Sequence, residues 1–144
     1  MGKIVFHPEL CTGCSACAIA CMDQNDIDVT KMRPFRRIRE IEQIENGEVV
    51  FGFRSDSCRH CENPPCAAAC PVGCLFYDDA LRLTRYHREA CISCKRCADA
   101  CPYDAISFFP DGTVGKCDGC GDRQRAGLTP ACVRVCPCGA LTVS

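Results

Sequence analysis

The sequence has little of the material from which an ordinary apolar core is built. It contains no tryptophan, and its seven Phe and three Tyr are scattered along 144 residues. Cysteines make up a large part of the 47% of residues counted as hydrophobic. Without them the apolar share falls to about a third, which is low for a globular domain. A chain of this length holds one or two small domains, which apolar burial alone would leave marginally stable.

Several kinds of targeting and binding segment are also missing. The opening residues MGKIVFHPEL have no apolar run of signal-peptide length, and no stretch approaches the roughly 18 apolar residues of a membrane-spanning helix. We therefore expect a reduced, cytoplasmic protein without direct membrane insertion, although a subunit of this kind can also be exported with a signal-bearing partner. There is no GxGxxG fingerprint, and GTVGKC at 112–117 lacks the spacing of a phosphate-binding loop. The basic residues lack the interleaved aromatics of nucleic-acid binding, so we expect no nucleic-acid partner and no catalytic site.

Cysteine is abundant instead, with eighteen residues, of which sixteen fall into four groups. The groups are Cys11, Cys14, Cys17 and Cys21; Cys58, Cys61, Cys66 and Cys70; Cys91, Cys94, Cys97 and Cys101; and Cys117, Cys120, Cys132 and Cys136. Three of the four groups end in Cys-Pro. Two cysteines are left over, and we predict that neither is a ligand. Cys74 aligns with alanines of the repeat and is expected to be a small packing residue, and Cys138 lies close to a predicted ligand.

The repetition extends beyond the cysteines. HPELC before Cys11 matches HREAC before Cys91, so His7 and His87 are equivalent and are expected to support strand ends. The tails CPVGCLFY, CPYDAISFF and CPCGALTV each predict a turn and a short strand. The Ala-rich segments before the fourth cysteines predict single helical turns. Residues 33–53 are an insert in which Asn46-Gly47 predicts a β-hairpin.

Three chemistries use closely spaced cysteines: disulfides, zinc and iron–sulfur clusters. Three cysteines at i, i+3 and i+6 can wrap around one cubane, while a fourth that precedes Pro ligates the neighbouring cluster. Zinc sites more usually combine two separated CxxC pairs, and a disulfide scaffold would need an export signal. The spacing therefore favours four [4Fe–4S] clusters, with a zinc-stabilised interaction module as the alternative.

Charged residues near these groups allow two interpretations. Four clusters with their thiolates would move the formal charge from −1 to about −9, so nearby basic residues would help to offset them. For most of the arginines, such as Arg33, Arg36, Arg37 and Arg39, we expect solvated surface positions. His60 lies between two predicted ligands, where it either tunes a cluster through a hydrogen bond or its charge, or simply faces solvent.

The second and fourth groups carry a family resemblance. CRHCENPPCAAACP and CDGCGDRQRAGLTPACVRVCP resemble motifs of the four-cluster iron–sulfur subunits of the dimethyl sulfoxide reductase family, and the resemblance covers almost the whole chain. It implies an α+β fold of two dicluster bacterial-ferredoxin-like modules, with small two-stranded sheets and short helices around four [4Fe–4S] clusters. The outer module would comprise residues 1–53 and 111–144, with the hairpin insert at 33–53. The inner module would comprise residues 54–110.

The same resemblance implies crossed ligation, in which each group lends its fourth cysteine to a neighbouring cluster. The four ligand sets would be Cys11, Cys14, Cys17 and Cys136 (set A); Cys117, Cys120, Cys132 and Cys21 (set B); Cys58, Cys61, Cys66 and Cys101 (set C); and Cys91, Cys94, Cys97 and Cys70 (set D). Because no quartet is broken, all four clusters are expected to be [4Fe–4S].

The expected function is that of a non-catalytic electron-transfer subunit, which relays single electrons between a catalytic subunit and a second redox partner. The resemblance implies a molybdenum- or tungsten-pterin oxidoreductase subunit, such as a formate dehydrogenase or an aldehyde oxidoreductase, or a hydrogenase subunit. A flavin-containing subunit, further iron–sulfur subunits and a higher-order assembly are compatible with it. Only eight residues follow Cys136, so we expect no membrane-anchor extension. A free polyferredoxin is the alternative within electron transfer, and the many arginines argue mildly against it.

Overall fold

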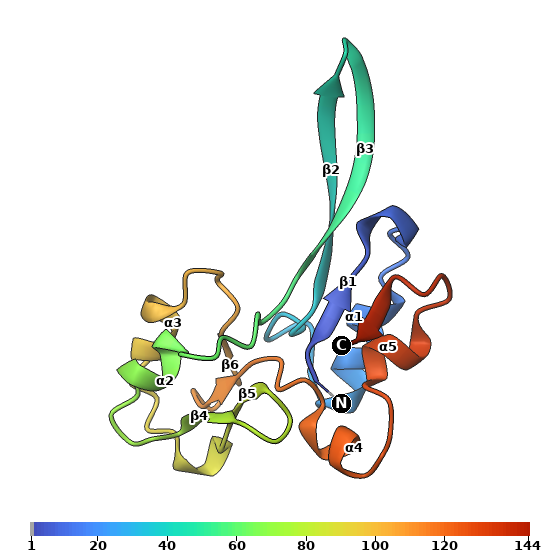
Figure 1. Ribbon diagram of the computed structural model, residues 1–144. Helices are drawn as coiled ribbons and strands as arrows, with labels where there is room; N and C mark the ends of the chain where they lie inside the picture. Colours follow the sequence, from blue (N-terminus) through green and yellow to red (C-terminus); the bar gives the residue numbers. More distant parts are fainter. Residues whose placement is uncertain (1) are drawn as a thin grey trace.

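Residues 2–144 are described by a computed structural model in which two lobes lie side by side and a long β-hairpin projects from them (Figure 1). The first and fourth cysteine groups lie in one lobe, and the second and third groups lie in the other. The first lobe contains β1 (Ile4–Phe6), α1 (Ala16–Gln24), α4 (Gly121–Arg125), α5 (Ala131–Val135) and β8 (Leu141–Val143). The second contains α2 (Pro65–Ala69), β4 (Leu75–Asp78), β5 (Leu83–Tyr86), α3 (Arg96–Ala100), β6 (Ser107–Phe108) and β7 (Val114–Gly115). This α+β architecture agrees with the expected fold class.

Residues 2–144 form four two-stranded antiparallel sheets, of which three are local hairpins and one joins distant parts of the chain. β1 pairs with β8 and closes the first lobe, with Ile4 opposite Val143. β4 pairs with β5 and β6 with β7. β4, β6 and β8 are the short strands predicted after the three Cys-Pro turns. The β6–β7 hairpin spans the predicted boundary at residues 110 and 111, and the division into modules itself stays a prediction.

Short helices carry the later cysteines of each group. α2, α3 and α5 have five residues each, close to the expected single turns, whereas α1 has nine. α1 packs against α5, and α2 packs against α3. The alanines of these helices allow close approach, so the first group meets the fourth and the second meets the third. Within residues 2–144, no helix has both the length and the apolar character needed to cross a membrane.

The repeated histidines begin matching 3₁₀ turns, Pro8–Leu10 and Arg88–Ala90. The backbone N–H of His7 donates to the Ala140 carbonyl at 2.8 Å, and that of His87 donates to the Cys74 carbonyl at 2.9 Å. Each histidine therefore supports a strand end, as its repeat position predicted.

In the described part of the chain, the core consists of three small groups of buried side chains in which thiols are prominent. The first is built around Leu75, Ile106 and Val114. In the second, Phe35 and Phe109 meet edge to face with ring centroids 6.0 Å apart. The third is built around Leu141. Every group includes at least two buried cysteines, so the sulfur atoms supply part of the core.

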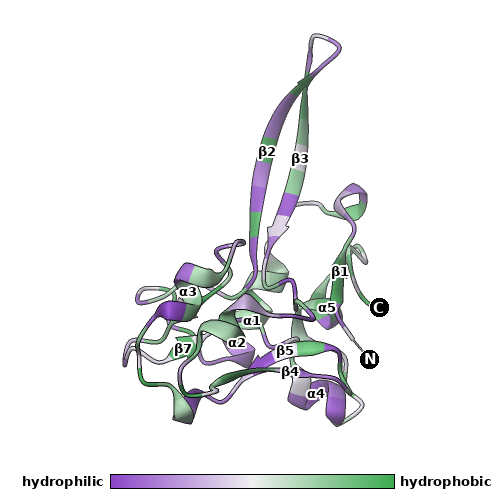
Figure 2. Cartoon of the chain, turned by 60° about the vertical axis from the view of Figure 1, so that its left-hand side comes forward, coloured by the Kyte–Doolittle hydropathy of each residue, from purple (hydrophilic) through white to green (hydrophobic). Residues whose placement is uncertain are grey.

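The hairpin insert forms as the Asn-Gly signal predicted. β2 (Arg37–Glu45) and β3 (Glu48–Asp56) pair along their full length. Asn46 and Gly47 have φ values of 52° and 81°, the left-handed conformation that a type I′ turn requires. The strands continue to residue 56, three residues beyond the predicted insert. Apolar and polar residues are mixed along the projecting part, where Ile44 is 79% exposed (Figure 2).

We predict that Gly115→Ala lowers the thermal stability of the loaded protein. A Cβ at this position would lie 2.7 Å from the Phe109 ring and 2.9 Å from the Phe35 ring, so the core would be overpacked at a cost of about 1–3 kcal/mol. Gly52→Ala is the matched control, because its Cβ would meet no atom within 4 Å. Anaerobic thermal unfolding should show a lower midpoint for Gly115→Ala alone. Equal midpoints would contradict this account of the packing.

Candidate iron–sulfur sites

All four cysteine groups begin with the same backbone turn. The residue just before the second cysteine has a positive φ in every group: 74° at Gly13, 49° at His60, 61° at Ser93 and 71° at Gly119. In each group the backbone N–H of this residue points to the sulfur of the first cysteine, at 3.3–3.4 Å. Because an N–H donor stabilises a thiolate, each turn is already shaped to hold a charged sulfur ligand.

Three of the predicted ligand sets line one cavity each. Set A surrounds one cavity together with Cys138, set C surrounds a second, and set D surrounds a third together with Cys74. The members of set B also lie together, since Cys21 lies close enough to Cys117, Cys120 and Cys132 for their charges to raise its pKa. The structure thus brings all sixteen cysteines together in the expected combinations. The assignment of each sulfur to a cluster stays a prediction.

Burial disfavours the thiolate form of several of these cysteines when no metal is bound. Burial raises the pKa of the Cys17 and Cys97 thiols to about 11, and it raises the pKa of Cys21 and Cys120 to about 12. A thiol that coordinates a metal ion loses its proton outright, because the cation replaces the lost solvation. These sulfurs therefore fit a cationic iron core as their partner.

The last cysteines of the second and fourth groups, Cys70 and Cys136, have a pKa that is lowered rather than raised. Burial alone would raise the pKa of Cys70, but backbone N–H groups of the following residues, among them Val72 and Leu75, outweigh it and lower the pKa. Cys136 is likewise held below its ordinary pKa, because N–H groups such as that of Ala140 outweigh its burial. The turns that follow Cys70 and Cys136 thus surround these two sulfurs with donors.

Arg36 supplies an independent test of whether an anionic group fits between sets A and B. Its side chain is 5% exposed, so it departs from the surface position expected for most arginines. Burial lowers its pKa, but the neighbouring charges of Cys117 and Cys132 outweigh burial and raise the pKa above its ordinary value. Nη1 donates to the Ser55 hydroxyl at 2.6 Å, whereas Nε is buried and has no hydrogen-bond partner among residues 2–144. A buried, unsatisfied N–H among thiols fits an iron–sulfur cluster, whose sulfur atoms accept hydrogen bonds.

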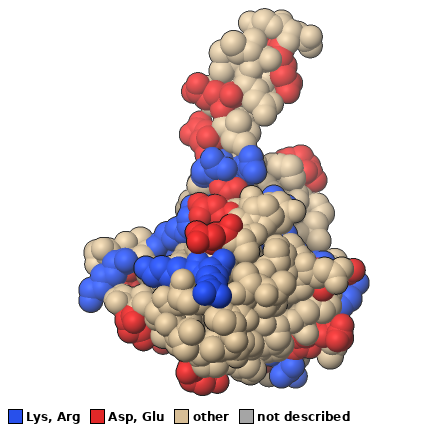
Figure 3. Space-filling model, turned by 90° about the vertical axis from the view of Figure 1, so that its left-hand side faces the viewer, with Lys and Arg blue, Asp and Glu red and all other residues tan. Residues whose placement is uncertain are grey.

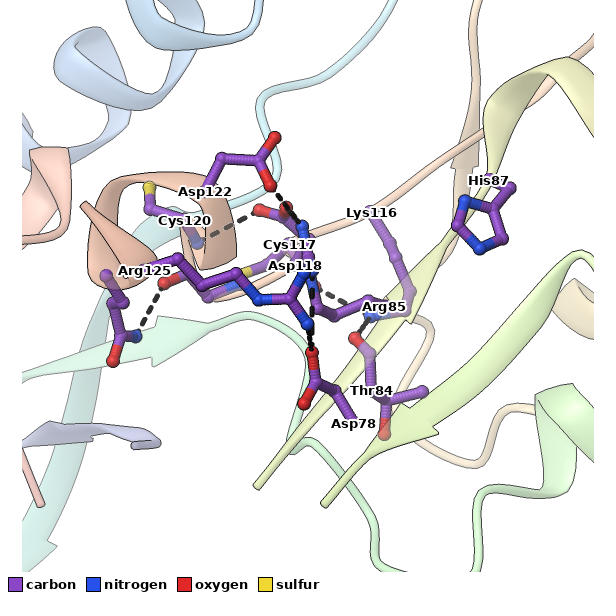
Figure 4. Close-up of polar contacts among 12 residues, drawn as sticks. Asp78, Thr84, Arg85, His87, Lys116, Cys117, Asp118, Cys120, Asp122 and Arg125 are labelled. Carbon is purple, nitrogen blue, oxygen red and sulfur yellow. Dashed lines mark hydrogen bonds and ion pairs between the residues drawn. The ribbon is translucent and has the colours of Figure 1, made fainter. Parts of the chain in front are cut away.

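A second buried cation, Lys116, lies where the two lobes meet, and the sequence analysis did not single it out. Lys116 is 1% exposed and directly precedes Cys117. Its ammonium group donates to the carbonyls of Thr84 and Cys117, the latter at 2.7 Å (Figure 4). The ammonium nitrogen also lies 3.4 Å from the Cys58 sulfur. Its position next to a cysteine was visible in the sequence, but its burial depends on the contact between the lobes.

His60 lies beside this lysine. It is 2% exposed, so the interpretation of a solvent-facing histidine is wrong. Its Nδ1 accepts a hydrogen bond from the Thr84 backbone N–H at 3.1 Å, and its Nε2 lies 3.6 Å from the Cys117 sulfur. Burial, followed by the charge of Lys116, lowers the pKa of His60 well below its ordinary value. The neutral ring therefore connects the loop of the second group to a sulfur of the fourth.

An ion-pair network joins the lobes next to this contact. Arg85 on β5 lies 2.7 Å from Asp122 and 3.5 Å from Asp78, and Asp78 also pairs with Arg125 (Figure 4). A Cβ on Gly121 would lie 2.4 Å from Arg85 Nε, so the helix α4 approaches this arginine at the closest distance that glycine allows. The network holds the lobes in a defined arrangement around Lys116 and His60.

The two left-over cysteines are both close to predicted ligands. Cys74 is buried, and its thiol donates to the His87 carbonyl at 3.1 Å, as expected for a small packing residue. Cys138 lies with its sulfur 3.7 Å from that of Cys136. That neither ligates iron stays a prediction.

Basic side chains gather at the base of the hairpin, where they line a pocket of about 350 Å³ (Figure 3). The arginines in its lining are Arg37, Arg39, Arg54 and Arg59. Asp56 and Asp104 offset part of this charge. Because residues 57, 59 and 102 flank Cys58 and Cys101, the pocket places positive charge beside set C.

Comparison with known proteins was consistent with this geometry. Residues 49–144 match the family described as "4Fe-4S dicluster domain", and residues 10–74 match a second family with the same description. The thiosulfate reductase electron transfer subunit PhsB of Salmonella typhi is 40% identical over 141 residues, which is 96% of this chain and 73% of the relative. A subunit of the anaerobic dimethyl sulfoxide reductase of Haemophilus influenzae is 39% identical over 146 residues, which is 94% of this chain and 70% of the relative.

A longer relative is the formate dehydrogenase-O iron-sulfur subunit of Escherichia coli (strain K12), which is 36% identical over 148 residues. The match covers 91% of this chain and 49% of that protein, so the chain spans about half its length. The resemblance seen in the second and fourth motifs is confirmed, and two dicluster domains account for four clusters. The chain belongs to the 4Fe–4S dicluster family and is an electron-transfer iron–sulfur subunit with four [4Fe–4S] clusters.

Proposed function

We propose that the chain relays single electrons between the catalytic subunit of an oxidoreductase complex and a second redox partner. The observation that carries the proposal is the repeated cysteine turn, present four times in two lobes that meet through Lys116 and His60. When bound, each [4Fe–4S] cluster supplies a one-electron redox couple. The chain's own residues hold the iron, exclude water and set the local charge.

The contacts support a linear order of the ligand sets. Sets A and B share α1 and α5, because Cys17 and Cys21 lie on α1 and Cys132 lies on α5. Sets C and D share α2 and α3 in the same way. His60 and Lys116 lie between sets B and C. The proposed order is therefore A, B, C and D, with set A in one lobe and set D in the other.

The proposed partner is a molybdenum- or tungsten-dependent oxidoreductase subunit or a hydrogenase subunit, as the family resemblance implies. The names of the relatives support an oxidoreductase complex, since they are subunits of thiosulfate reductase, dimethyl sulfoxide reductase and formate dehydrogenase. The basic pocket beside set C offers a surface of positive charge to such a complex. A flavin-containing subunit on the other side of the relay belongs to the same proposal.

The first experiment is a count of iron and acid-labile sulfide in anaerobically purified native protein, together with identification of the subunits bound to it. About sixteen of each per chain are expected for four cubanes. A bound oxidoreductase subunit supports the proposed relay, whereas a chain that purifies alone with all its iron would favour a free polyferredoxin.

We also propose the crossed ligand sets, and Cys101→Ser tests them. Cys101 lies in the third group but lines the cavity of set C, so its loss should perturb the cluster held by Cys58, Cys61 and Cys66. Electron paramagnetic resonance of the variant, with each centre assigned, should show a changed spectrum for that cluster. A change confined to the cluster of Cys91, Cys94 and Cys97 would overturn the crossed assignment.

Cys74→Ser is the matched control for this variant. Its sulfur is buried and satisfied by the His87 carbonyl, so the substitution should leave the iron count unchanged. Loss of about four irons per chain would show instead that Cys74 is a ligand.

Removal of iron should unfold most of the chain. The buried groups of side chains are small and rich in thiols, so the free energy of cluster binding is largely free energy of folding. Circular dichroism of protein treated anaerobically with an iron chelator should show loss of the native spectrum without a cooperative thermal transition. A cooperatively folded iron-free form would contradict this prediction.

A further inference from the structure

The place where the two lobes meet, around Lys116 and His60, is called the lobe junction here. It contains a buried positive charge that no described carboxylate neutralises. Among residues 2–144 no ion pair joins Lys116 to Asp or Glu, although the junction has acidic residues such as Asp78 and Asp118 nearby. The contacts of its ammonium group are two carbonyls and the sulfur of Cys58. A fully buried ammonium is costly unless a negative charge offsets it. Here the negative partner is the thiolate environment of Cys58.

The contacts at the junction also determine which ring nitrogen of His60 carries the proton. Because the Thr84 N–H donates to Nδ1, that nitrogen carries a lone pair. In the neutral ring the single proton is then on Nε2, which faces the Cys117 sulfur at 3.6 Å. His60 thus directs one N–H donor at a ligand of set B, while its own loop holds set C.

From these contacts we propose that Lys116 and His60 act together as a positioning and tuning pair that raises the reduction potentials of the two central clusters, those of sets B and C. The proposal rests on the proposed electron relay, and it uses only Cys117 and Cys58 from the ligand assignment. Lys116 places positive charge beside Cys58, and His60 donates a hydrogen bond to Cys117. Both interactions favour the additional negative charge that reduction brings, since nearby charge and hydrogen bonds to sulfur set the potential of such clusters.

Set D also has a lysine nearby, and its exposure contrasts with the burial of Lys116. Its cavity includes Lys95, which is exposed and which the Phe108 ring faces at 5.2 Å, so solvent screens this charge. Lys116 is screened far less because it is buried. A lysine at the junction therefore has a strong effect on the potential of the nearby cluster, whereas the exposed lysine beside set D has a weak one.

A purely structural role for Lys116 makes a different prediction. If the lysine served only to satisfy the carbonyls of Thr84 and Cys117, an uncharged donor would replace it without a change in potential. Lys116→Gln keeps donor groups and removes the charge, whereas Lys116→Arg keeps the charge. Lys31→Gln is the matched control, because Lys31 is an exposed lysine that pairs with Asp28 at 3.8 Å, away from the junction.

The test is a redox titration of the iron-loaded native protein as purified, with any subunits that remain bound, monitored by electron paramagnetic resonance. Cys58→Ser and Cys117→Ser assign the two centres. In Lys116→Gln we expect the reduction equilibrium of the Cys58 centre to weaken by tenfold or more, which is about 59 mV for one electron. His60→Phe should lower the potential of the Cys117 centre. Lys116→Arg and Lys31→Gln should leave the Cys58 centre within about twofold of the native equilibrium, or about 18 mV.

Each outcome decides the proposal. Unchanged potentials in Lys116→Gln with its full iron content would overturn it. Loss of iron from both Lys116→Gln and His60→Phe would assign the pair a structural role and would also overturn it. A failure of the relay itself gives a different result, because the potentials would still shift in the isolated chain while no oxidoreductase partner binds. A failure of the crossed ligand sets would appear only in Cys101→Ser.

Discussion

The structure depends on the electrostatic cost of placing so many sulfur ligands out of water. Buried thiols such as Cys21 and Cys120 hold their protons tightly, so they become thiolates only in the presence of a cation. Iron supplies that cation, and the protein supplies what iron alone does not: N–H donors at each turn and two buried basic side chains. The small apolar groups between the helices then complete a core that is organised around the metal.

In the proposed relay, the packing of the helices joins four similar cysteine loops into a single path. α1 against α5 and α2 against α3 each bring two cysteine groups together, and the ion pairs of Arg85 fix one lobe on the other. At the junction of the lobes, the proposed path passes from set B to set C. There, polar contacts take the place of a shared helix pair.

Much of this was predictable from the sequence, for a physical reason. Metal-ligand spacing and turn chemistry are local, so the cysteine groups, the Asn46-Gly47 turn and the strands after each Cys-Pro could be deduced without tertiary information. Burial of charge is not local. Three residues of types that usually lie at the surface are buried here: Lys116, Arg36 and His60. Only the fold shows that thiols surround them. The extension of the hairpin to residue 56 depends in the same way on contacts at its base, where the Phe53 ring closes over Gly13.

The pairing of β1 with β8 has a consequence for biosynthesis. Residues 4–6 are synthesised well before their partners, residues 141–143, because most of the sequence lies between the two strands. Helices α2 and α3 and the sheet β4–β5 are complete much earlier, and their contacts span short lengths of chain. The lobe formed by the middle of the sequence can therefore acquire its metal while the other still waits for its closing strand.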